Sequence, residues 1–116
     1  DPRLKTPEDA RVYRDDNYRI YSYRKSERHR VRNVGKSQKL LSELLRDRYV
    51  SGVQSIMVEG GARTIQSFID ADLWDEAMVL IGHSSFGEGL AAPKMACRAD
   101  EVTELGNDTI LTYLRG

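Results

Sequence analysis

Three consecutive residues near the middle of the chain, Glu59, Gly60 and Gly61, carry the clearest chemical signal in the sequence. They follow an apolar run that predicts a buried strand and precede a pattern that predicts a helix, which is where open α/β sheets bind ligands. Glycines let a phosphate approach the backbone, and the free N–H groups at the start of a helix attract an anion. Glu59 could accept hydrogen bonds from a polar substrate in the same crevice.

The same turn also fits a purely structural interpretation. A glycine pair is common in tight strand-to-helix turns, and the carboxylate of Glu59 could simply be solvated. The segment matches neither the dinucleotide fingerprint G-x-G-x-x-G nor a phosphate-binding loop that ends in Gly-Lys-Ser/Thr. The residues alone therefore leave both a ligand-binding corner and a plain turn open.

Two other segments contain residue types that bind or catalyse in other proteins. Residues 82–89 (GHSSFGEG) follow the next predicted strand, and His83 could act there as an acid or base, although a lone loop histidine is more often structural or solvated. The basic segment 24–36 follows Tyr18, Tyr21 and Tyr23, a composition that could bind RNA. A solvated basic face balanced by acidic residues explains this segment more simply, so no nucleic-acid partner is predicted.

The composition is that of one globular domain in a chain of 116 residues. The single cysteine, Cys97, excludes an internal disulfide, and the two histidines, His29 and His83, lie far apart, so no metal site is predicted. No apolar run approaches the roughly 20 residues that span a bilayer. We therefore expect a cytoplasmic protein without a membrane partner.

The formal net charge of zero conceals an asymmetry between the two halves of the chain. Residues 1–52 carry 14 basic and 8 acidic side chains, whereas residues 53–116 carry 4 and 10. Such a split can mark a half that faces a polyanion. Attraction between two halves of one domain is the simpler interpretation.

The hydrophobic pattern predicts alternating strands and helices. Strands are predicted at residues 18–23, 53–58, 76–81 and 109–115, with a short extended piece around residues 31–34. The first helix would begin at an N-cap on Ser37 and stop at Gly52, with one apolar face made of Leu40, Leu41, Leu44, Leu45 and Tyr49. The second helix would cover residues 61–70, with Ile65, Phe68 and Ile69 inward. This order predicts a layered α/β domain with a mixed, mostly parallel sheet and an antiparallel C-terminal edge.

Several stretches, in the order in which they occur, resemble one known family. These are residues 55–61 (SIMVEGG), 66–71 (QSFIDA), 73–76 (LWDE) and 86–93 (FGEGLAAP). Together they resemble the C-terminal reductase domain of the bifunctional riboflavin biosynthesis deaminase/reductase. The opening residues 1–4 (DPRL) resemble that family's Asp-Asn-Pro-x-Leu-Thr-Val-Arg motif, and residues 105–108 (LGND) resemble its terminal β-region. The similarity is close over residues 53–93 and looser at both ends.

The resemblance implies a three-layer fold like that of dihydrofolate reductase and a homodimer. It also implies a reaction, in which NADPH reduces 5-amino-6-(5-phosphoribosylamino)uracil to its ribitylamino product. In the family, the residues that correspond to Glu59 and Leu4 contact the phosphorylated pyrimidine substrate. The residues implied to line the NADPH site are Gly61, Ala62, Arg63, Thr64, Ile65, Gln66 and Ser67. Hydride transfer needs positioning more than a strong protein acid or base, so no catalytic proton donor is assigned.

The sequence departs from the family pattern in three ways. Pro7 stands where the family motif has an arginine that would face the substrate's phosphate. The strand and helix that complete the cofactor site, and the zinc motifs of the deaminase half, have no counterpart in the sequence. We therefore expect residues 1–116 to form a partial reductase domain with little turnover by itself.

Two other functions stay open at this point. Because of Pro7, a related dihydrofolate-reductase-like enzyme could act on another substrate. The basic segment could also make the chain a non-enzymatic module that binds RNA or another polyanion. Loss of salt-dependent RNA binding on neutralising Arg28, Arg30 and Arg32 would favour that second function.

Overall fold

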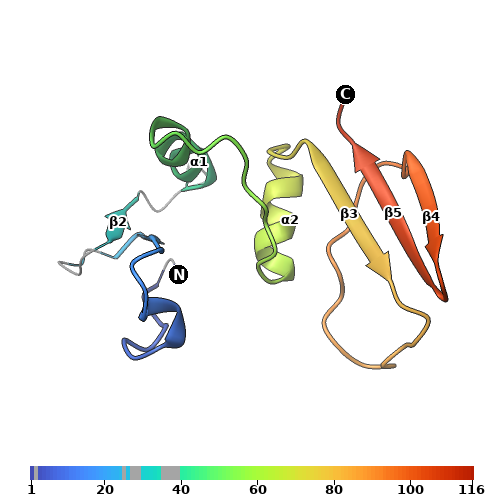
Figure 1. Ribbon diagram of the computed structural model, residues 1–116, viewed down its shortest axis with the longest axis horizontal. Helices are drawn as coiled ribbons and strands as arrows, with labels where there is room; N and C mark the ends of the chain where they lie inside the picture. The colour runs from blue at the N-terminus through green and yellow to red at the C-terminus, as the bar shows by residue number, and fades with distance from the viewer. Residues whose placement is uncertain (2, 25, 27–29, 35–39) are drawn as a thin grey trace. The chain divides into compact units, whose positions relative to one another are not determined.

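The computed structural model describes residues 1, 3–24, 26, 30–34 and 40–116 (Figure 1). These residues form two compact units, unit 1 (Asp1–Ile56) and unit 2 (Met57–Gly116), which we describe separately. The boundary between the units coincides with the change in charge along the sequence. Residues 53–56 are uncharged, so unit 1 carries the basic surplus and unit 2 the acidic surplus.

Unit 1 contains two short parallel strands, a 3-10 turn and a helix. The elements are η1 (Arg11–Tyr13), β1 (Ile20–Ser22), β2 (Val31–Asn33) and α1 (Leu40–Val50). Strand β1 pairs with β2 in parallel, with Ile20 opposite Val31 and Ser22 opposite Asn33. Ile20 and Val34 are buried apolar side chains, and Ser22 is fully buried. The strand predicted at 18–23 and the extended piece at 31–34 are confirmed, although each strand is only three residues long.

Helix α1 confirms the first predicted helix and its stop. Gly52 has φ +85°, a left-handed conformation that glycine adopts without steric cost. Its N–H donates to the carbonyl of Tyr49 at 2.9 Å, and the N–H of Val53 donates to the carbonyl of Arg48 at 3.1 Å. The prediction that Tyr49 belongs to the apolar face is wrong, because its side chain is 79% exposed in the last turn. Ser37, the predicted N-cap, lies outside the described residues.

The strand predicted at residues 53–58 is wrong. The segment has no regular secondary structure, and Met57 is 83% exposed. A β-strand requires a partner for its backbone N–H and C=O groups, and no described strand pairs with this segment. The apolar composition that predicted a buried strand instead belongs to the exposed connection between the two units.

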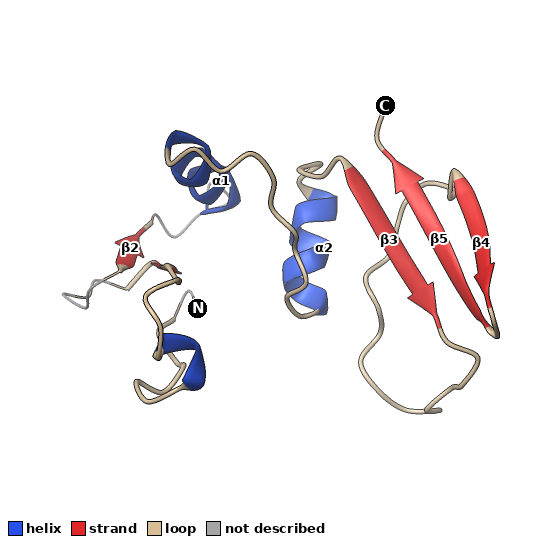
Figure 2. Cartoon of the chain, in the orientation of Figure 1, coloured by secondary structure: helices blue, strands red, loops and turns tan. Residues whose placement is uncertain are grey.

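Unit 2 contains one helix and a three-stranded antiparallel sheet (Figure 2). The elements are α2 (Ala62–Asp70), β3 (Glu76–Ile81), β4 (Glu101–Leu105) and β5 (Asp108–Leu114). Strand β5 lies in the centre, with Ala77 of β3 opposite Tyr113 and Val102 of β4 opposite Leu111. The predicted second helix, the strand at 76–81 and the C-terminal strand are confirmed. Strand β4 was not predicted.

The core of unit 2 is small. Its buried apolar side chains are Phe68 of α2 and Tyr113 of β5, and α2 lies beside β3 (Figure 1). Because side chains alternate along a strand, Met78 and Leu80 face away from the side of Ala77 and Tyr113, and they are 60% and 72% exposed. The sheet therefore has one apolar face that the described residues of the unit leave uncovered.

Hydrogen bonds hold the end of β5 against the turn that follows α2. The N–H of Arg115 donates to the carbonyl of Asp75 at 2.8 Å. The Arg115 guanidinium also pairs with the carboxylate of Asp72 and donates to its carbonyl. Asp72 has φ +60°, which turns the chain sharply between helix and strand. These bonds fix the sheet relative to the helix that follows the Glu59–Gly61 turn.

The α/β class predicted from the sequence is confirmed. The finer prediction, three layers around a mixed and mostly parallel sheet, is not confirmed. Among the described strands, the parallel pairing is confined to β1 and β2, and the larger sheet is entirely antiparallel. A parallel centre would have required the segment 53–58 to pair, and it does not.

Candidate functional site

The turn formed by Glu59, Gly60 and Gly61 leads directly into α2. Gly61 is the N-cap of the helix, with φ −42° and ψ 161°. Its carbonyl accepts hydrogen bonds from the N–H groups of Thr64 at 2.8 Å and Ile65 at 3.2 Å. The side chain of Glu59 is exposed. Because residues 53–58 form no strand, the prediction that a strand ends at this turn is wrong. The predicted start of the helix is confirmed.

The start of α2 is suited to an anion. No side chain caps the helix, and its first turn contains no acidic residue. The first N–H groups of a helix have no acceptor within it, so the helix presents those of Ala62 and Arg63. A Cβ atom built on Gly61 would meet no atom of the described residues within 4 Å. A pyrophosphate could therefore approach this backbone, with Arg63 in the same turn to balance its charge.

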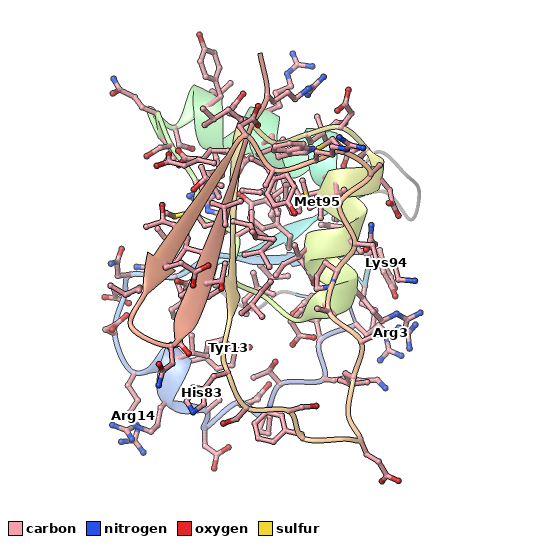
Figure 3. All side chains as sticks on the ribbon, turned by 90° about the vertical axis from the view of Figure 1, so that its right-hand side faces the viewer. Arg3, Tyr13, Arg14, His83, Lys94 and Met95 are labelled. Atoms are coloured by element: carbon pink, nitrogen blue, oxygen red, sulfur yellow. The ribbon has the colours of Figure 1, made fainter. Side chains whose placement is uncertain are left out.

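Gln66 joins α2 to the chain segment that follows β3. Its Oε1 accepts from the N–H of Lys94 at 2.8 Å, and its Nε2 donates to the carbonyl of Lys94 at 3.3 Å. The Nε2 also donates to Asp70 at 2.8 Å. Lys94 and Met95 lie on the strip of chain beside α2 (Figure 3). The amide of Gln66 is thus bonded to protein partners. These bonds hold the end of the glycine-rich loop, residues 82–93, against α2.

The other helix residues predicted to line a cofactor site differ in how accessible their polar groups are. Ile65 is half-buried, on the helix beside Phe68, a core residue that was not predicted to line the site. The hydroxyl of Ser67 donates to the carbonyl of Thr64 at 2.6 Å, a bond within the helix. Arg63 and Thr64 are exposed in the first turn. The polar groups near the helix start are therefore those of Arg63 and Thr64.

His83 lies just beyond β3, where it contacts Asp108 at the beginning of β5 (Figure 3). Oδ1 of Asp108 accepts from the backbone N–H of His83 at 3.2 Å and lies 3.3 Å from its Nδ1. Both side chains are more than half exposed. This arrangement ties the start of the glycine-rich loop to the sheet, which supports the structural interpretation of His83.

Leu4 belongs to unit 1, in a tight turn built on Asp1. The carboxylate of Asp1 accepts from the N–H groups of Lys5 and Thr6, each at 2.9 Å. The N–H of Leu4 donates to the carbonyl of Asp1 at 3.2 Å, and its φ of +52° is unusual for a residue other than glycine. Leu4 is half-buried and Pro7 is exposed. The structure thus describes the two predicted substrate contacts, Leu4 and Glu59, in different units.

Unit 1 also contains a cluster of charged residues that the sequence did not predict. Asp47 of α1 is 15% exposed, and three guanidinium groups approach it. Its carboxylate lies 2.9 Å from Arg48, 3.6 Å from Arg19 and 3.8 Å from Arg32. The phenol of Tyr21 donates to the same carboxylate at 2.5 Å. The hydrogen bond from Tyr21, together with Arg48 and Arg19, lowers the pKa of Asp47 below its ordinary value.

The three tyrosines that were considered for RNA stacking are engaged within unit 1. Arg30 lies over the ring of Tyr18 at 5.6 Å, and Arg48 lies over the ring of Tyr21 at 5.8 Å. The hydroxyl of Tyr23 accepts from Arg3 at 3.0 Å. Stacking of bases requires open aromatic faces, so the arginines over the rings of Tyr18 and Tyr21 weaken the interpretation of this segment as an RNA surface.

Within the described ranges, no group of three or more His, Cys, Asp or Glu side chains could hold a metal ion. Cys97 is a free, exposed thiol. None of the helices in the described part of the chain is long and apolar enough to cross a membrane.

The α/β elements and the uncapped start of α2 place the chain among α/β proteins with a helix start suited to an anionic ligand. A family model described as the RibD C-terminal domain matches residues 1–111. The chain therefore belongs to the RibD C-terminal domain family. The resemblance drawn from the sequence is thus confirmed.

The chain is also similar to a known protein. The riboflavin biosynthesis protein RibD of Aquifex aeolicus (strain VF5) is 32% identical over 72 residues, which cover 54% of this chain and 20% of that protein. The chain thus aligns with about a fifth of the length of this relative.

Proposed function

We propose that the chain forms part of an NADPH-dependent reductase of riboflavin biosynthesis, with 5-amino-6-(5-phosphoribosylamino)uracil as its substrate. Membership of the RibD C-terminal domain family supports the pathway and the class of reaction. The observation that carries the proposal within the structure is the helix start at Gly61, which has no side-chain cap and room for an anion. The setting that we propose is the cytoplasm.

In this proposal the chain's own residues bind and position the reactants. The backbone N–H groups of Ala62 and Arg63 hold the cofactor's pyrophosphate, and the helix dipole favours its charge. Glu59, one residue before the glycine pair, accepts hydrogen bonds from the pyrimidine. NADPH, when bound, supplies the hydride. Gln66 contributes indirectly, because its bonds to Lys94 hold the loop segment beside the same helix.

A pair of substitutions at Gly61 tests the cofactor site. Both Gly61→Asp and Gly61→Asn place a good N-cap side chain on α2, and the observed φ and ψ accept either residue. Only the Gly61→Asp change adds a negative charge where the pyrophosphate is proposed to lie. We expect G61D to weaken NADPH binding by about tenfold or more and G61N by less, because the asparagine cap occupies an N–H group without adding charge, with the melting temperature of both at or above that of the parent.

The outcomes of this test distinguish a cofactor site at the start of α2 from a site elsewhere. NADPH binding can be followed by the fluorescence of its nicotinamide ring. An affinity of both the G61D and the G61N chain equal to that of the parent would show that the cofactor's anionic part binds elsewhere. If the parent chain shows no affinity for NADPH at any attainable concentration, the proposed cofactor site in this chain is wrong.

A reductase that acts on a related, unphosphorylated substrate is the second candidate. Pro7 favours it, because this exposed position offers no cation to a phosphate. The two candidates differ in the response to the substrate's phosphate. NADPH oxidation that is equally fast with the phosphorylated and the dephosphorylated pyrimidine would favour the second. We further propose that the active form is a homodimer, which light scattering under assay conditions would test.

A further inference from the structure

Unit 1 contains a hollow lined almost entirely by arginine. It has a volume of about 380 Å³, and its lining residues are Arg19, Arg30, Val31 and Arg32. A neighbouring hollow of about 210 Å³ shares Arg19 and Arg30 and is also lined by Asp16, Asn17, Tyr18 and Arg48. Arg19 immediately precedes strand β1, and β2 carries Arg32. The parallel pairing of these strands therefore brings together guanidinium groups that are far apart in sequence.

The positive charge of this arginine hollow exceeds the negative charge around it. Four guanidinium groups, those of Arg19, Arg30, Arg32 and Arg48, share two carboxylates. Asp47 serves three of them. Asp16 pairs with Arg30 at 3.2 Å but is 92% exposed, and such a pair contributes little. Each arginine thus has a carboxylate within 4 Å, but the four cations and two carboxylates together leave an excess of two positive charges.

Hydrogen-bond donors in the cluster also lack acceptors. The Nε atoms of Arg30 and Arg48 are buried and have no hydrogen-bond partner among the described residues. A buried donor without an acceptor is costly, so these guanidinium groups are not fully paired within the described chain. The excess of two positive charges and the open hollow beside them describe an anion site.

We propose that the arginine hollow binds a phosphate monoester. This group carries between about one and a half and two negative charges near neutral pH and presents three acceptor oxygens, which matches the surplus charge. Guanidinium groups recognise such oxygens in pairs. Sugar phosphates and the 2′-phosphate of a dinucleotide both present the group. The site does not depend on the proposed reductase function, since none of its residues belongs to the turn before α2.

A longer nucleic acid fits the same surface less well. Single-stranded RNA sites combine basic side chains with open aromatic rings. The ring of Tyr18 is covered by Arg30 and lies 5.0 Å from that of Tyr13, and Tyr21 is engaged with Arg48 and Asp47. The hollow thus offers charge and donors without a stacking surface.

Protection of arginines from phenylglyoxal tests the site in the unaltered chain. Ribose 5-phosphate should protect Arg19, Arg30 and Arg32, as read by mass spectrometry, whereas ribose should not. Arg11, an exposed arginine of unit 1, should be modified equally under all conditions. Protection by NADPH is then compared with protection by NADH, which lacks the 2′-phosphate. This comparison distinguishes a dinucleotide 2′-phosphate from a sugar phosphate as the source of the bound group. The proposal is overturned if ribose 5-phosphate and NADPH protect none of the three.

Substitutions provide a second, quantitative test by calorimetry with ribose 5-phosphate. Arg32→Gln, at a side chain 60% exposed, should weaken binding by roughly threefold to tenfold, since hydrogen bonds to charged groups are being lost. Arg32→Lys should recover part of the affinity, and Arg11→Gln, with the same change of charge, should leave it unaltered. Equal losses of affinity in R32Q and R11Q would show that the anion responds only to the overall charge of the chain, and they would overturn the proposal. Binding of a twelve-nucleotide RNA that ribose 5-phosphate cannot displace would also overturn it.

Discussion

The phenol of Tyr21 donates a 2.5 Å hydrogen bond to the carboxylate of Asp47, across 26 positions of sequence. The bond joins strand β1 to helix α1, and Arg48 lies against both partners. Burial, with the bond to Asp47, raises the pKa of the Tyr21 phenol, while the same bond lowers the pKa of Asp47. This pair is a direct polar connection between β1 and α1.

Unit 1 should lose stability in acid because of Asp47. Its folded-state pKa is depressed, so the stabilisation is fully present above the unfolded value of about 3.9 and is lost as the pH falls through the lower folded value. Thermal unfolding followed across the acid range, from neutral pH downward, should show this loss. Asp47→Asn should lower stability at neutral pH and flatten the acid limb. The same change at exposed Asp9 should do neither.

Removal of the Tyr21 hydroxyl should destabilise unit 1. Tyr21→Phe keeps the ring under Arg48 but deletes a hydrogen bond to an ionised acceptor, which contributes about 2 kcal/mol. Urea denaturation measures the difference. Tyr49→Phe in the same unit is the matched control, because Tyr49 is 79% exposed, and it should be neutral. A neutral result for both would mean that water replaces the phenol at no cost.

Gln66→Ala should free the chain segment around Lys94. The substitution removes both hydrogen bonds between the Gln66 amide and the Lys94 backbone, while alanine preserves the helix. Amide hydrogen exchange at Lys94 should become faster, and α2 should remain protected. Gln54→Ala, at an exposed position without regular structure, should change neither. Unaltered exchange at Lys94 in the Gln66→Ala chain would show that other contacts hold the segment.

Gly52→Ala should destabilise the end of α1 by about 1 kcal/mol, because a Cβ atom is strained in the left-handed region. Gly52 has φ +85° although open space surrounds it, so the cost comes from the backbone and not from a clash. Gly82→Ala is the control, since its Cβ atom would make an ordinary contact of 3.8 Å with Asp108. Comparable losses at the two positions would contradict the conformational explanation.

Local patterns predicted the helices of this fold well. The apolar spacing of Ile65, Phe68 and Ile69 predicted α2, whose hydrogen bonds lie within the segment itself. Gly52 predicted the end of α1, because the turn that ends a helix is also formed within the local segment. Strand β3 was also predicted, because its apolar run is bounded by polar residues on one side and by Gly82 on the other.

Strands were predicted less well, because a strand depends on its partners. The run at 53–58 is apolar enough for a buried strand, yet no described strand pairs with it. Strand β4 was missed although Val102 and Leu105 precede a turn at Gly106, where φ is +64°. Its side chains are all exposed, so the alternation that predicts a half-buried strand is weak. Pairing with β5 alone makes it a strand.

The candidate sites likewise divide into one with a local sequence signal and one that depends on contacts between distant residues. The turn at Gly61 was found from the sequence because a glycine pair before a helix is a local signal. The arginine hollow was found only in part. The basic segment 24–36 was singled out for a polyanion, but Arg19 and Asp47 join its arginines only when β1 pairs with β2 and packs against α1. No spacing in the sequence encodes that distance.

The exposed connection at residues 53–58 gives the chain a predictable point of scission. It contains apolar residues that thermolysin accepts, such as Ile56 and Met57, and no lysine or arginine for trypsin. A cut there would produce one polycationic and one polyanionic fragment of nearly equal length. An ion exchanger would retain the two on opposite resins, so each half of the molecule could be purified and its fold examined in isolation.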